Sequence, residues 1–167
     1  DGRSARTLPQ WRDVRQFGAA YWSVVVIGAV FTLARFSEAF LILRAHDAGL
    51  SLAWTPLALV VMNLTYVASA YPAGKLSDRI GRVGLLALGL ALLIVADMIL
   101  ALSTHVGPTL VGIAVWGLHL GLTQGLLAAL VADTAPANLR GSAFGVFYLV
   151  VGVATLVASL LAGVLWE

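Results

Sequence analysis

An arginine and a glutamate interrupt the first long apolar segment of the sequence, and their charges make them candidates for binding chemistry. Arg35 and Glu38 stand three residues apart within Trp22–Leu43, a spacing that puts two side chains on the same face of a helix. A charged side chain near the centre of a membrane helix costs roughly 2.5–3.5 kcal/mol, so its presence needs a reason. The pair predicts either a cavity that binds a charged substrate or passes a proton, or a permanent ion pair that fixes helix packing. We favour the cavity, because intramembrane charges usually mark a site.

A histidine in the middle of a later apolar segment is a second candidate. His119 shares a helical face with Gly112, Trp116 and Thr123, whereas Gln124 lies about 140° away around the helix axis. A histidine that lines a cavity could change its protonation near neutral pH. A neutral histidine that bonds to a neighbouring helix is the alternative, and both interpretations stay open.

Three further polar residues lie inside apolar segments. Asn63 and Tyr66 are three residues apart and reach either a substrate pathway or a neighbouring helix; the helix contact is the favoured interpretation, because polar side chains often join membrane helices. For Asp97, a structural pairing with Arg44 or with a neighbouring backbone is favoured over a site.

Glycine recurs at every fourth residue, at Gly117, Gly121 and Gly125. This spacing places small residues in a stripe along one side of a helix, where two membrane helices can approach closely. The stripe predicts a helix-packing surface rather than a ligand site.

The composition identifies the environment of these residues. Of 167 residues, 60% are hydrophobic and only 11% are charged, whereas soluble domains are about half apolar and about a quarter charged. A mean hydropathy of +0.96 excludes a soluble globular enzyme and a disordered chain. The absence of cysteine and a net charge of only +2 exclude thiolate metal sites and a nucleic-acid-binding face. Without a metal-ligand set, a phosphate loop or a nucleophile with its base, the sequence predicts no metal, no cofactor and no enzyme.

A helix needs about 20 mostly apolar residues to cross a bilayer, and five segments meet this requirement. They are Trp22–Leu43, Trp54–Gly74, Val83–Leu102, Gly107–Val131 and Ser142–Trp166. The predicted fold is therefore all-α, a polytopic membrane helical bundle with five transmembrane helices and short connections. Residues 1–21 are predicted to form a cytoplasmic lead-in, in which Leu8–Ala20 is either a short interfacial helix or a tethered linker. Because Asp1 is not a methionine, we expect the chain to be a fragment.

Basic residues predict the orientation of the bundle. Eight of the ten lie on one side of the alternating topology: Arg3, Arg6, Arg12, Arg15, Lys75, Arg79, Arg82 and Arg140. Basic loops stay in the cytoplasm. We therefore expect the N-terminal segment and the connection Lys75–Arg82 inside the cell and Glu167 outside.

The basic connection between the second and third segments has a distinctive pattern. Gly74, Asp78, Arg79, Gly81 and Arg82 combine two glycines, which permit close backbone approach and positive φ, with fixed charges at helix ends. Such charges could pair with a neighbouring helix end, with carboxylates or with lipid phosphates, and so act as a conformational latch. A solvated turn that only fixes topology is the alternative.

These five residues resemble the signature G-x-x-x-D-R-x-G-R of the major facilitator superfamily, position by position. Val83 follows, where members of the family often carry another basic residue. The connection from Asp133 through Pro136 to Arg140 and Gly141 resembles the matching acidic–Pro–Arg-Gly turn of that family.

The resemblance implies a fold, a function and partners. The five segments would correspond to the seventh to eleventh of twelve helices, and the partners would be the N-terminal half and last helix of the same protein, a small-molecule substrate and membrane lipid. The family implies secondary active transport across the inner membrane by alternating access, here with proton coupling. In that scheme Arg35 and Glu38 line the pathway with His119, while the signature acts as the latch with Asp133 and Arg140. The alternative is a non-transporting assembly or regulatory membrane protein with the same helices.

Overall fold

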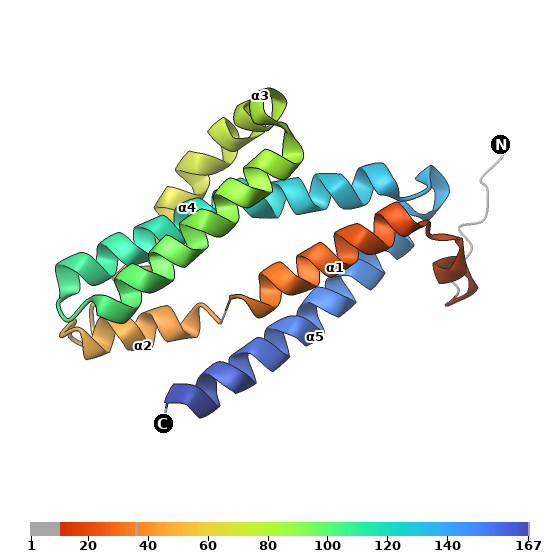
Figure 1. Cartoon of the computed structure of the whole chain (residues 1–167). Helices are drawn as coiled ribbons and strands as arrows, with labels where there is room; N and C mark the ends of the chain where they lie inside the picture. Colours follow the sequence, from red (N-terminus) through yellow and green to blue (C-terminus); the bar gives the residue numbers. More distant parts are fainter. Residues whose placement is uncertain (1–10, 36, 167) are drawn as a thin grey trace, which may run out of the picture. The chain divides into compact units, whose positions relative to one another are not determined.

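The computed structural model describes residues 11–35 and 37–166, and within them it contains only helices (Figure 1), so the predicted all-α class is confirmed. Arg3, Arg6 and Glu167 lie outside the described residues. The elements in chain order are η1 (Trp11–Gln16), α1 (Ala19–Leu33), α2 (Ala39–Asp47), α3 (Leu57–Leu102), α4 (Val106–Thr134), η2 (Ala137–Leu139) and α5 (Arg140–Trp166). They form two compact units. One contains η1, α1, η2, α5 and the end of α4 from Ala128, and the other contains α2, α3 and α4 as far as Leu127.

The first expected span, Trp22–Leu43, is not one helix. α1 ends at Leu33 and α2 begins at Ala39. The Arg35 N–H donates to the Thr32 carbonyl three residues back (3.1 Å), and the Ser37 hydroxyl accepts the Ala39 N–H (3.4 Å). A serine side chain that takes a backbone N–H offers an alternative to helical bonding, which accounts for the interruption at this polar stretch.

α3 combines the second and third expected spans and is a hairpin of two arms, residues 57–80 and 82–102 (Figure 1). The expected connection Lys75–Arg82 is therefore not a loop, because helix continues to Ile80. The reversal occurs at Gly81, which has φ 75° and ψ 164°. Positive φ is accessible to glycine because it has no Cβ. At 1.5 Å per residue each arm is roughly 30–36 Å long, which matches a hydrocarbon core of about 30 Å.

α4 packs closely against the first arm of α3. A Cβ at Gly117 would collide with the Thr65 hydroxyl and the Met62 carbonyl, and a Cβ at Gly121 would collide with the Ser69 hydroxyl and lie 2.7 Å from the Tyr66 carbonyl. The later residue of α4 meets the later residues of the first arm. α4 and the first arm therefore run parallel.

α4 also packs against the second arm of α3, in the opposite direction. A Cβ at Gly89 would collide with the methyl group of Thr123, and one at Gly112 would lie 3.0 Å from side-chain atoms of Leu100. The earlier residue of the second arm, Gly89, meets the later residue of α4, Thr123, and Leu100 meets Gly112. The two helices therefore run antiparallel, as expected for consecutive spans. α4 therefore holds both arms of the hairpin.

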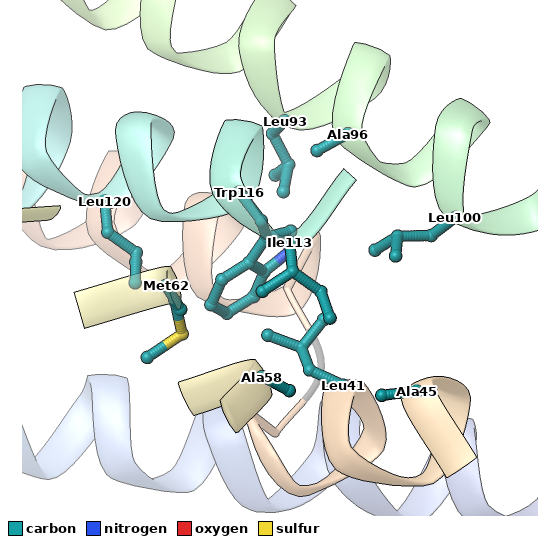
Figure 2. Close-up of a cluster of buried hydrophobic side chains, with 10 residues drawn as sticks. All are labelled: Leu41, Ala45, Ala58, Met62, Leu93, Ala96, Leu100, Ile113, Trp116 and Leu120. Carbon is teal, nitrogen blue, oxygen red and sulfur yellow. The ribbon is translucent and has the colours of Figure 1, made fainter. Parts of the chain in front are cut away.

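Large apolar side chains complete this unit near the open end of the hairpin (Figure 2). Trp116 and Ile113 of α4 lie among Leu41 of α2, Met62 of the first arm and Leu93 of the second. All five are nearly or fully inaccessible. Four segments therefore share one core, and their rotations about their own axes are coupled by it.

In the other unit, α1 and α5 lie side by side and run parallel (Figure 1). The Tyr21 hydroxyl donates to the Ala143 carbonyl (2.8 Å), and a Cβ at Gly28 would lie 2.6 Å from the ring of Phe147. Parallel direction is what an alternating topology requires of helices separated by three intervening spans.

The lead-in is only partly described. The expected interfacial helix Leu8–Ala20 is represented by the 3₁₀ helix η1, and its first residues lie outside the described part of the chain. Phe17 is buried, and its ring centroid lies 4.4 Å from that of Tyr21. The lead-in is therefore anchored to α1 through aromatic contact.

The glycine stripe of α4 provides a matched test of the helix packing. We expect Gly121→Ala to lower the free energy of unfolding by about 1–3 kcal/mol, because the new methyl group meets backbone atoms of α3 that cannot move away. Gly125→Ala is the control, since a Cβ at Gly125 has nothing within 4 Å. Thermal unfolding in detergent, followed by circular dichroism, measures the difference. Equal stability of the two variants would contradict the packing.

Candidate functional site

The first candidate site lies where α1 gives way to α2. Arg35 is half-buried and Glu38 is exposed, and both lie in the non-helical stretch between Leu33 and Ala39. The expectation that they share one helical face is therefore wrong, because Arg35 lies beyond the end of α1 at Leu33 whereas Glu38 is the N-terminal cap residue of α2. The interruption leaves an ionisable side chain on each side of the break, Arg35 in the first unit and Glu38 in the second. Discontinuous helices of this kind form substrate and ion sites in several transporter folds.

His119 lies between α4 and the second arm of α3. It is 0% exposed, and its Nδ1–H donates to the Gly89 carbonyl (2.7 Å), which places the proton on Nδ1. Thr123, one turn further along, is also buried at the Gly89 contact. The face that the sequence connected with a cavity is thus a helix–helix interface. The alternative in which the histidine bonds to a neighbouring helix agrees with this contact.

Asn63 and Tyr66 do not meet at a common site. The Asn63 amide is exposed and donates to the Leu59 carbonyl of its own helix (2.8 Å). Tyr66 is half-buried and packs against the core around Trp116. One of the two residues therefore bonds within its own helix and the other contributes to packing.

The signature residues occupy the closed end of the α3 hairpin. Asp78 and Arg79 lie in the last helical turn of the first arm, Gly81 makes the reversal, and Arg82 begins the second arm. All four are exposed. Gly74 is helical, and a Cβ at this position would have nothing within 4 Å, so the close approach expected there is absent. The conformational requirement for glycine lies at Gly81.

The second motif forms the turn from α4 to α5. α4 ends at Thr134, and Pro136 precedes the short helix η2. Arg140 begins α5, and its Nε–H donates to the Ala132 carbonyl (3.1 Å). The arginine therefore supplies a donor to the carboxyl end of α4, where helical carbonyls lack partners. Asp133 and Gly141 are exposed on either side of this turn.

Arg44 has a role that the sequence did not reveal. Its guanidinium donates from Nε to the Leu100 carbonyl (2.9 Å) and from Nη2 to the Ser103 carbonyl (2.5 Å). A cation at the carboxyl end of α3 also compensates the helix dipole. Arg44 thus caps α3 rather than pairing with Asp97, which is half-buried and whose Oδ1 has no hydrogen-bond partner among the described residues. The cap by Arg44 depends on the proximity of α2 to the end of α3, which the sequence does not show.

The structure also contains a cavity that no sequence pattern indicated. It has a volume of about 1000 Å³ and lies between the two arms of α3 and one face of α4. Its walls include Leu88 and Leu92 from the second arm and Leu118 and Leu122 from α4. Among the residues that the structure describes, no group of three or more His, Asp or Glu side chains could hold a metal ion.

Comparison with known proteins identifies the family. The model of the Major Facilitator Superfamily matches residues 4–166, which covers both motifs and every described helix. The chain belongs to this superfamily. Three of its described helical segments are long and apolar enough to cross a membrane, namely Leu57–Leu102, Val106–Thr134 and Ala137–Leu165. With the family, they make it a multi-pass membrane protein.

Relatives within the superfamily are longer than this chain. An uncharacterized MFS-type transporter of Methanocaldococcus jannaschii is 35% identical over 150 residues, which are 86% of this chain and 37% of that protein. An uncharacterized MFS-type transporter of Mycobacterium tuberculosis is 33% identical over 62% of this chain and 19% of its own length. Myo-inositol transporter 2 of Schizosaccharomyces pombe is 36% identical over 44% of this chain and 13% of its own length. The chain therefore spans 37% or less of the length of each of these relatives.

The hydrogen bond of His119 predicts how substitutions will behave. We expect His119→Leu to lower the free energy of unfolding by about 0.5–1.5 kcal/mol, because it removes the donor to the Gly89 carbonyl. His119→Gln keeps an N–H donor and should lose less. Thermal unfolding in detergent compares the two variants with the parent protein. Equal losses would show that the bond does not contribute to stability.

Proposed function

We propose that this chain forms most of the C-terminal half of a secondary active transporter that moves a small solute across the cytoplasmic membrane by alternating access. Its match to the Major Facilitator Superfamily over residues 4–166 carries the proposal, since members of this family transport solutes through two helical halves that rock around a central site. The missing partners would be the N-terminal half and the last helix of the same protein. In this assignment the described helices correspond to the seventh to eleventh.

The interruption between α1 and α2 supports a solute or proton site at Arg35 and Glu38. Two ionisable residues beside a break between two helices, inside a segment that is otherwise apolar, are costly unless they have a function. In broken membrane helices, backbone groups released from helical bonding are available to a substrate or ion. Glu38 is the residue through which we expect proton coupling, because a carboxyl group can both bind and release a proton.

The closed end of the α3 hairpin supports the latch. Asp78 lies in the last turn of a helical arm, where a negative charge is opposed by the helix dipole. A residue type that is unfavourable for its own helix indicates an interaction elsewhere, and the amino-terminal end of another helix would be a favourable partner. We expect Asp78, with Arg79, Arg82, Asp133 and Arg140, to stabilise the state that is closed to the cytoplasm.

The orientation follows from the same basic residues. Lys75 and Arg79 lie in the last turns of the first arm of α3, Arg82 begins the second arm, and Arg140 follows the turn from α4 to α5. An alternating topology places both of these helix ends on the same side of the membrane. Because positively charged connections stay in the cytoplasm, we propose that the closed end of the hairpin and the turn from α4 to α5 face the cytoplasm.

A transport measurement tests the function and the site together. The intact protein is reconstituted into vesicles and screened against neutral, anionic and cationic small solutes, with and without a pH gradient. We expect gradient-dependent movement of one solute class, which Arg35→Ala and Glu38→Gln each reduce by at least about tenfold, equivalent to about 1.4 kcal/mol of binding or barrier energy. Asp47→Asn is the control, because Asp47 is an exposed carboxylate of α2 beyond the interruption.

Three outcomes are informative. If no solute moves faster than in protein-free vesicles, the transporter proposal is contradicted and a non-transporting membrane protein is favoured. If both variants transport as well as the parent, the site is not at Arg35 and Glu38. If Glu38→Gln transports without responding to the pH gradient, the carboxyl group is the coupling residue.

Cysteine labelling tests the latch. The chain contributes no cysteine of its own, so Asn138→Cys introduces a reporter on the exposed η2 segment. We expect Asp78→Asn to increase its labelling by a membrane-impermeant reagent applied from the cytoplasmic side, by up to about fivefold, because exposed ion pairs contribute at most about 1 kcal/mol. Asp47→Asn should leave labelling unchanged. A labelling rate that is the same in Asp78→Asn and in the parent protein would contradict the latch.

A further inference from the structure

The open cavity between the two arms of α3 and α4 has a lining that is apolar along most of its length. The first arm contributes small or apolar residues such as Ala68 and Ala73, the second arm contributes Leu88 and Leu92, and α4 contributes leucine and valine side chains along one face. Its volume of about 1000 Å³ is at the upper end of the range of roughly 300–1,000 Å³ that is typical of ligand sites. The cavity is therefore large enough for an elongated apolar group.

The hydroxyl groups of the lining are already used by their own helix. Thr65 donates to the Met62 carbonyl (2.9 Å), and Ser69 donates to the Thr65 carbonyl (2.7 Å). The apolar part of the cavity thus presents few groups that could orient a polar solute, so a sugar or an amino acid is a poor fit.

All the formal charge of the lining lies at one end. Lys75 and Arg79 are the only ionisable residues among those that line the cavity, and both are exposed. They are four residues apart in the last turns of the first arm, a spacing that places two side chains next to each other on a helix. The Lys75 ammonium also lies 4.8 Å from the ring centroid of Tyr71, one turn earlier in the same arm. The cavity therefore has an apolar body and a cationic mouth.

We propose that this cavity binds an anionic phospholipid of the membrane, with one acyl chain along the apolar walls and the headgroup phosphate between Lys75 and Arg79. The acyl chain matches the lining, and the phosphate matches the paired cations, because guanidinium and ammonium groups both donate to phosphate oxygens. A zwitterionic lipid carries an ammonium group that these cations repel, and a small anion without a chain leaves the apolar walls uncovered. Basic pockets between membrane helices on the cytoplasmic side bind anionic headgroups in this way.

The membrane leaflet that supplies the lipid depends on the orientation proposed above. If the closed end of the hairpin faces the cytoplasm, the cationic mouth lies at the leaflet that is rich in anionic lipid. The binding chemistry itself depends on neither transport nor sidedness. A measurement in detergent therefore tests the site even if the transporter proposal fails.

Native mass spectrometry of the intact protein in detergent measures lipid binding directly. The probes are phosphatidylglycerol and phosphatidylcholine with identical acyl chains. We expect phosphatidylglycerol to bind at least about tenfold more tightly, and the double variant Lys75→Gln/Arg79→Gln to weaken it by about 30-fold, at about 1 kcal/mol per basic residue. Arg15→Gln is the matched control, because Arg15 is an exposed arginine of η1 that does not line the cavity.

Two further arms test the apolar part of the site. Leu92→Trp fills space between the second arm and α4 while leaving both cations in place, so it should weaken the binding of phosphatidylglycerol by several-fold. Unchanged circular dichroism shows that the variant is folded. Glycerol phosphate, which has the charge without the acyl chains, should not displace the lipid at equal concentration.

Several results would overturn the proposal. Equal affinity for the two lipids would show that the cations do not select the headgroup. An equal loss in Arg15→Gln and in the double variant would show that only overall charge matters. Displacement by glycerol phosphate would indicate a simple anion site instead of a lipid site.

Discussion

The close contact of α4 with both arms of α3 is the constraint on which this structure depends. Gly117 and Gly121 let the α4 backbone approach the first arm, and Gly89 of the second arm receives the side chain of Thr123. In a membrane, lipid tails are as apolar as the side chains they replace, so helices gain little from burial alone and associate through close packing. Glycine at these positions therefore allows closer contact between the hairpin and α4 than a larger residue would.

This contact decides what the neighbouring polar residues can do. Because α4 is pressed against the second arm, His119 reaches the Gly89 carbonyl and is enclosed there. The same rotation of α4 turns a different face, with Leu118 and Leu122, toward the open cavity between the two arms. An interface and a cavity thus lie on two faces of one helix, and the first fixes the lining of the second.

The charged ends of the helices are organised by a few hydrogen bonds. Arg44 caps α3 and Arg140 caps α4, in each case by donating to carbonyls that have no helical partner. Two arginines are thereby used for local structure, whereas Arg79 and Lys75 remain at the mouth of the cavity. The few charges of the chain are thus divided between the ends of its helices and the mouth of the cavity.

The sequence by itself determined the membrane environment, the all-α class and the family, because hydropathy, charge distribution and short motifs are properties of local segments. It also predicted a chain reversal between the second and third spans, but it did not distinguish Gly81, where the reversal occurs, from Gly74, which is helical. It also identified Gly117 and Gly121 as small residues on one stripe, but it could not distinguish them from Gly125, which meets no neighbour. The end of α1 at Leu33, the cap by Arg44, the enclosure of His119 and the cavity were decided by the tertiary structure. Each depends on how far apart two helices lie and how each is rotated about its axis, and these quantities are set by packing between segments that are distant in the chain.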